Sequence, residues 1–148
     1  MAKACKKPAP IARWGKSFAG LRAITIKQPW AWLIVNGYKD IENRSWRTRY
    51  RGTLLIHAGV SRSDIGESTR SRILRRYGIK LPDQSDIGGV VGVADVIDCR
   101  GRTDSPWHIP ANIGWVLSKP RPLKFRPCQG ALSLFNPRFA RKHHRKIR

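Results

Sequence analysis

The sequence predicts an α+β fold: a small β-barrel of five to six strands with two or more flanking helices. Three observations support this prediction. Short runs rich in β-branched and other apolar residues recur along the chain and are separated by glycine, proline and polar turns. Two other segments have helical spacing of their apolar residues. The chain has 148 residues, of which 41% are hydrophobic, enough for one domain with a single core.

The strand predictions rest on short apolar runs between turn signals. Residues 88–99 form a long, almost wholly apolar run, and its glycines would let a strand bend as barrel strands do. The proline-rich residues 120–127 are expected to connect the last two strands. The six predicted strands cover residues 21–26, 40–46, 52–59, 88–99, 113–120 and 130–137.

Two segments are predicted to be helices. The first is about two turns long, with Pro29 suited to the first helical position and Asn36-Gly37 suited to its end. The second lies within residues 61–78, where Gly78 can end it and Asp64 with Glu67 resembles a capping box. The residues expected to be buried are Trp30, Leu33 and Ile34 of the first helix and Ile73, Leu74 and Tyr77 of the second.

The charge distribution divides the chain into three parts. The formal net charge is +21, from 30 basic and 9 acidic residues, and all the acids lie between Asp40 and Asp104. This pattern predicts a basic flexible N-terminal arm (1–20), a central domain (21–136) and a basic C-terminal tail (137–148). Such an excess implies a polyanionic partner. Nucleic acid is favoured over a membrane, because the tail cations pair with too little apolar surface for an amphipathic anchor.

The cysteines give no sign of a disulfide framework or a structural metal site. Cys5, Cys99 and Cys128 are far apart, odd in number and without a C-x-x-C pair. Reduced thiols in a cytoplasmic protein therefore fit best. A zinc site would need the fold to gather Cys99 and Cys128 with His57 and His108, so no metal and no other cofactor is expected.

The segment "GYKDIENRSW" (37–46) contains the candidate site. If it is a strand, Glu42, Arg44 and Trp46 share one face, and Lys39 at the preceding turn can lean over it. Glu42 could then order the two cations toward a phosphate, while Trp46 offers a surface on which a base can stack. The alternative is a solvated Glu–Arg pair on an edge strand, worth under about 1 kcal/mol.

The spacing Gly37, Lys39, Glu42, Arg44 matches the pattern G-x-K-x-x-E-x-R and resembles the signature of the ASCH domain family. The flanking stretches, from residue 22 to about 136, resemble the family's strands and first helix in order. The resemblance implies a PUA-like barrel with an RNA-binding cleft. Some members of the family are described as ribonucleases. One bacterial branch acts as amidohydrolases on acetylated cytidine, using the motif lysine, a threonine and a later glutamate.

This sequence departs from that amidohydrolase branch. Glu42 stands where the threonine would be, and the later strand offers Asp95 and Asp98, which alternate onto opposite faces, in place of a glutamate. His57 could act as a general base but is expected to be a core histidine.

Two hypotheses for the function follow. In the first, the protein binds RNA, with DNA or a nucleotide as alternatives, through Lys39 and Arg44. In the second, it hydrolyses RNA or a modified nucleoside, with Lys39 stabilising negative charge and Glu42 acting as general base. Neighbouring cations favour the charged form of Glu42, so it suits an organising role better. Further backbone contacts are expected from Tyr50, Arg51, Arg141, Lys142, Arg145 and Lys146.

Overall fold

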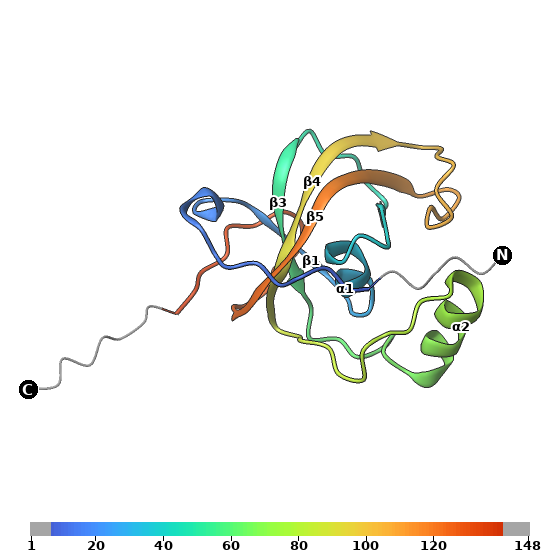
Figure 1. Cartoon of the computed structure of the whole chain (residues 1–148). Helices are drawn as coiled ribbons and strands as arrows, with labels where there is room; N and C mark the ends of the chain where they lie inside the picture. The colour runs from blue at the N-terminus through green and yellow to red at the C-terminus, as the bar shows by residue number, and fades with distance from the viewer. Residues whose placement is uncertain (1–6, 141–148) are drawn as a thin grey trace, which may run out of the picture.

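The computed structural model describes residues 7–140. Five strands form one sheet in the order β1-β3-β4-β5-β2, and the sheet curls into a half-barrel (Figure 1). Neighbouring strands are antiparallel except β1 and β3, which are parallel. The strands are β1 (Ala23–Ile26), β2 (Ile41–Arg44), β3 (Gly52–Ala58), β4 (Gly89–Arg100) and β5 (Ile113–Pro127). The predicted α+β class and small barrel are confirmed.

Three helical elements accompany the sheet: η1 (Lys16–Phe18), α1 (Trp30–Val35) and α2 (Glu67–Tyr77). Helix α1 lies in the hollow of the curled sheet, and α2 lies outside it (Figure 1). Within residues 7–140, no helix combines the length and apolar character needed to cross a membrane.

Strand β5 differs from its prediction. It runs through the prolines at 120–127 as one strand of 15 residues, although these residues were expected to be a connection. Only its first part, Ile113–Val116, pairs with β2, whereas β4 pairs along most of its length with three register shifts. Proline cannot donate a ladder hydrogen bond, so it is tolerated where one edge has no strand partner and where bulges interrupt the ladder. Residues 130–137 form no strand; their one bridge joins Phe135 to Ala23.

The core is organised around α1. Its residues Ala31, Ile34 and Val35 pack against the inner face of the sheet, while Leu33 faces a second cluster that includes Ile73 of α2. The prediction that Leu33 and Ile34 are buried is confirmed, but Trp30 is only half-buried. This short helix therefore joins the sheet to α2.

The ends of α2 show which local signals the sequence used. Gly78 ends the helix in the left-handed conformation (φ 69°), as predicted. The predicted capping box was wrong: the helix starts after Gly66 without a side-chain cap, and Asp64 instead accepts a hydrogen bond from Trp30 Nε1 at 2.9 Å. Leu74 is 51% exposed, because only Ile73 and Tyr77 face the neighbouring cluster.

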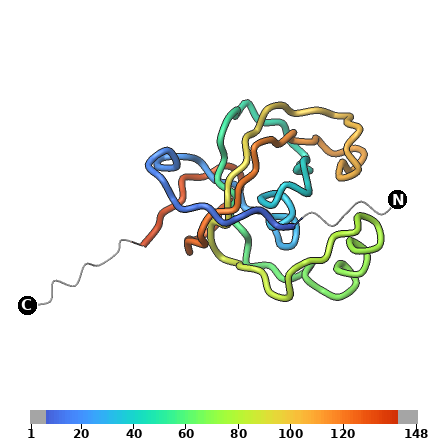
Figure 2. Tube along the Cα trace, in the orientation of Figure 1, coloured from blue at the N-terminus to red at the C-terminus, as the bar shows by residue number. Residues whose placement is uncertain are grey.

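The described part of the predicted N-terminal arm contacts the barrel. Ala12 bridges Leu123 of β5, and the N–H of Ala12 donates to Pro122 O at 2.9 Å. Figure 2 shows this segment crossing the C-terminal half of β5. Trp14 Nε1 donates to Lys124 O at 2.7 Å, and Phe18 is buried.

We expect Gly92→Ala to destabilise the protein by about 2 kcal/mol, because overpacking a tight core costs this much. At Gly92 of β4, both α1 and β5 approach the backbone closely: a Cβ atom there would lie 2.6 Å from Val35 Cγ1 and would clash with the Arg121 carbonyl oxygen. Urea unfolding measures the loss. Gly101→Ala, whose nearest added contact is 3.8 Å away, serves as the control. Equal stability of the two variants would contradict this packing.

Candidate functional site

The motif residues form one charge cluster. Lys39 Nζ lies 3.3 Å from Glu42 Oε2, and Arg44 Nε lies 3.2 Å from Glu42 Oε1. One carboxylate thus bridges two cations, with a different oxygen facing each. Lys39 and Glu42 are only 6% and 9% exposed and form a buried ion pair, and Arg44 is half-buried. The interpretation as a solvated surface pair is therefore wrong.

The local chain path explains why the cluster forms. Gly37 has φ 80°, a left-handed conformation that reverses the chain after α1. The N–H groups of Tyr38 and Lys39 then donate to Leu33 O, at 2.9 and 3.0 Å. This turn delivers Lys39 beside the start of β2, where its ammonium also donates to Ile41 O.

Arg44 connects the two edges of the sheet. β1 and β2 are the outermost strands, and Arg44 Nη2 of β2 donates to Thr25 O of β1 at 2.7 Å. Arg44 Nε lies at ion-pair distance from Glu42, but its N–H is not directed at the carboxylate well enough for a hydrogen bond. This buried N–H has no other acceptor among the described residues. The guanidinium therefore closes the open side of the half-barrel.

Two pockets meet at this cluster. The first, of about 470 Å³, is lined by Lys39 and Glu42; the second, of about 480 Å³, is lined by Glu42 and Arg44. Glu42, Asn43 and Trp30 line both pockets. Since Asp64 fixes the indole of Trp30, the boundary between the pockets is held by a defined hydrogen bond.

The far wall of the first pocket comes from α2 and the segment before β5, and sequence reasoning did not assign it to the site. Arg72 and Arg76 line the pocket from α2. Tyr77 and Trp107 stack there with ring centroids 3.8 Å apart, and the Arg76 guanidinium lies 5.4 Å from the Tyr77 centroid. The i, i+4 spacing of the two arginines beside the apolar positions 73 and 77 was the available signal.

Other candidate residues do not join the cluster. Trp46 packs edge-on against buried Trp115 at 4.8 Å and lines neither pocket. The Tyr50 hydroxyl donates to Thr53 O, and burial raises the pKa of Tyr50. Arg51 donates to Thr48 O at 2.8 Å and lies 3.9 Å from Asp98. These three residues support the turn before β3 and the adjoining strands.

The acids of β4 and the histidine of β3 are also apart from the pockets. Asp95 accepts from Thr53 Oγ1 at 2.8 Å. Hydrogen bonds from Arg100 and the Cys99 N–H lower the pKa of Asp98. His57 is buried, with Nε2 donating to Cys128 O at 2.8 Å and Nδ1 bonded to Thr25 Oγ1 at 3.2 Å. It is a core histidine whose ring nitrogens are both bonded, as expected.

Two further predictions concern the C-terminal tail and a metal site. The tail cations Arg141, Lys142, Arg145 and Lys146 lie outside the described residues. Among residues 7–140, no group of three or more His, Cys, Asp or Glu side chains is placed to hold a metal ion together.

Comparison with known proteins identifies the protein family. The structure combines a curled five-stranded sheet with a Lys–Glu–Arg cluster at its open side. Residues 24–116, which include this cluster, match the family model of the ASCH domain. The match covers more than half of the chain, so the protein belongs to the ASCH domain family, with a PUA-like barrel.

Two curated relatives are similar over 99 residues. Activating signal cointegrator 1 of Homo sapiens is 35% identical, and activating signal cointegrator 1 of Mus musculus is 36% identical. In both cases the alignment covers 64% of this chain but 17% of the relative. The chain therefore corresponds to about a sixth of each relative's length.

Proposed function

We propose that this protein binds RNA and holds a phosphate-bearing part of it at the Lys39–Glu42–Arg44 cluster. Membership of the ASCH family supports a general RNA-binding role. The observation that carries the finer proposal is the bridging carboxylate: Glu42 fixes two cations, and each cation lines a different one of two adjoining pockets.

The cluster has donors that suit a phosphate. The Lys39 ammonium has three N–H groups, of which Ile41 O and Glu42 accept two. The third is available to a ligand in the first pocket. Arg44 uses Nη2 for Thr25 O, and the rest of its fork borders the second pocket. Arg72 and Arg76 add positive charge across the first pocket, and a base could lie against the Tyr77–Trp107 wall.

The terminal segments would add contacts without sequence choice. Residues 1–20 and 137–148 are rich in lysine and arginine and contain no acid. Cations on such segments neutralise phosphates and release counterions, which gives salt-dependent affinity. In this proposal the cluster supplies the positioned grip, and the basic segments increase its strength.

We expect Arg44→Lys to weaken RNA binding about tenfold. Lysine keeps the charge, but it lacks the planar fork with which arginine can bind Thr25 O and a phosphate at the same time. A hydrogen bond from a charged group contributes roughly 1.5–3 kcal/mol, so losing one accounts for the expected change. Fluorescence anisotropy with a short labelled single-stranded RNA measures the affinity. Arg49→Lys, at an exposed position, is the matched control. Equal affinities of the two variants would remove Arg44 from the proposal.

A second candidate is hydrolysis of RNA or a modified nucleoside. The observation that favours it is that Lys39 and Glu42 line the first pocket together with His108. The same binding samples, run on a denaturing gel beside a Glu42→Gln variant, separate the two. RNA shortened by the unmodified protein and left intact by the variant, with circular dichroism showing that the variant is folded, would make the cluster catalytic. Intact RNA in every lane would exclude ribonuclease activity on that RNA.

A further inference from the structure

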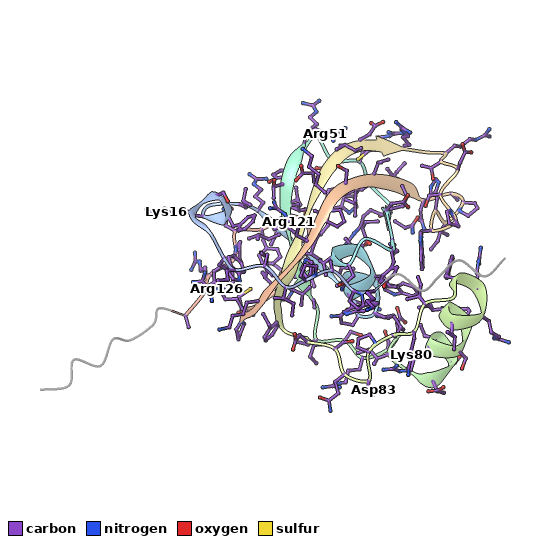
Figure 3. All side chains as sticks on the ribbon, viewed as in Figure 1. Lys16, Arg51, Lys80, Asp83, Arg121 and Arg126 are labelled. Carbon is purple, nitrogen blue, oxygen red and sulfur yellow. The ribbon has the colours of Figure 1, made fainter. Side chains whose placement is uncertain are left out.

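A second cationic surface lies away from the motif pockets. It consists of Arg121 and Arg126, which lie over the rings of Trp14, Phe18 and Phe139, together with the neighbouring Lys16, and is called the basic aromatic face below. Figure 3 shows Lys16, Arg121 and Arg126 on the side of the molecule that carries η1, whereas Lys80 and Asp83 lie beside α2. All the cations and rings of the basic aromatic face lie outside residues 24–116, the region that matches the ASCH domain. Leu55 of β3, which lines the adjoining hollow, is the contact with the barrel core.

The aromatic residues of this face are packed together from two distant parts of the chain, the segment around η1 and the segment after β5. Trp14 contacts Phe18 and Phe139 edge-on, with ring centroids 6.4 and 5.3 Å apart. Trp14 is held by its hydrogen bond to Lys124 O, and Phe139 forms an antiparallel bridge with Cys128. The platform therefore has a defined position relative to β5.

The arginines are positioned by this platform. The Arg126 guanidinium lies 4.0 Å from the Phe139 ring centroid and 5.2 Å from that of Trp14, and Arg121 lies 5.4 Å from that of Phe18. A guanidinium held over a ring keeps its N–H donors at its edge, and a planar fork positioned in this way loses less entropy when it binds a phosphate.

Within residues 7–140, no carboxylate neutralises the face. Residues 7–39 and 105–140 contain no acid, and neither arginine has an ion-pair partner among the described residues. A hollow of about 670 Å³ next to the rings is lined by Lys16 and Arg126 and by no acidic side chain. Unpaired cations beside aromatic rings are the combination that recognises single-stranded nucleic acid.

We propose that the basic aromatic face is a second binding surface for single-stranded nucleic acid, which contacts the phosphate backbone independently of the motif cluster. The proposal extends the RNA binding proposed above and rests on it. The face supplies affinity rather than sequence choice, because its donors are aimed at phosphates. An acidic protein segment is the competing partner, and the test separates the two.

The test measures binding of a labelled oligouridine RNA, and of the matched DNA, to the full chain over a range of salt concentrations. The face variant is Arg121→Gln with Arg126→Gln; the control is Arg75→Gln with Lys80→Gln, which removes the same charge from exposed positions. We expect the face variant to lose about tenfold in affinity at 0.15 M salt and its salt slope to fall by about 1.4, since each contact to a single strand contributes roughly 0.7. The control should change much less.

Further variants separate folding and the motif site from the face. Arg121→Lys with Arg126→Lys should keep the salt slope, and thermal unfolding checks that every variant is folded. Equal losses in the face and control variants would overturn the proposal, as would a labelled polyglutamate that binds the face more tightly than RNA. If Arg44→Lys weakens RNA binding and the face variant does not, the second surface is refuted and the proposed function stands. If the unmodified chain binds no RNA, both proposals are refuted.

Discussion

Glu42→Gln is expected to lower the free energy of unfolding by about 3 kcal/mol. The substitution keeps the size of the side chain but leaves buried Lys39 and the adjacent Arg44 without their shared counterion. Removing one partner of a buried ion pair typically costs 3–5 kcal/mol, because the remaining charge is uncompensated. The amide would also present N–H donors to one of the two cations. Urea unfolding, followed by circular dichroism, measures the change.

A matched control for this prediction is Glu67→Gln. Glu67 is exposed in the first turn of α2 and makes no ion pair among the described residues, so its loss should be within about 0.5 kcal/mol. The double variant Lys39→Met, Glu42→Gln should recover part of the stability, since it no longer buries an unpaired ammonium. A loss below about 1 kcal/mol for Glu42→Gln alone would mean that solvent screens the cluster.

Trp115→Ala is expected to destabilise the protein by about 4 kcal/mol. Trp115 is fully buried, packs against Trp46 and donates from Nε1 to Trp46 O at 3.0 Å. Truncating a buried tryptophan typically costs 3–5 kcal/mol, from lost transfer energy and the cavity that remains. This is a large fraction of the stability of a small domain. Thermal unfolding measures it.

The Trp115→Ala substitution should also disturb the candidate site. Trp115 lies opposite Glu42 in the β2–β5 pairing and opposite Cys99 in the β4–β5 pairing, so it holds the motif strand in register. Trp115→Phe keeps most of the buried area and loses the indole donor; it should cost less than half as much. If Trp115→Ala were as stable as Trp115→Phe, the tryptophan would not be holding this part of the sheet.

The fold class and most elements could be predicted because their signals are local. Apolar runs bounded by glycine identified β3 and β4, and Gly78 identified the end of α2. β5 was misjudged because prolines normally argue against a strand interior. They are accepted here because β2 pairs only with its first residues, and that pairing pattern is a property of the assembled sheet.

The candidate site was predicted only in part for the same reason. The grouping of Lys39, Glu42 and Arg44 follows from strand alternation, but their burial does not. Asp64 looked like a helix cap because capping is a local pattern, whereas its partner Trp30 is 34 positions earlier in the chain. The arginines of α2 come to the pocket because Ile73 packs into the same cluster as Leu33 of α1, which no short stretch of sequence reveals.

The continuity of β5 sets a length scale for any ligand that reaches both cationic surfaces. Trp115, opposite the motif strand, and Arg126 of the basic aromatic face are eleven positions apart on this strand, at most about 36 Å. At about 3.4 Å per stacked base, that distance corresponds to roughly ten nucleotides. If both proposed surfaces bind RNA, an RNA too short to span this distance would occupy one surface at a time. A longer RNA bound at one surface would meet the other at a high effective concentration, so affinity should rise steeply once the RNA is long enough to span both.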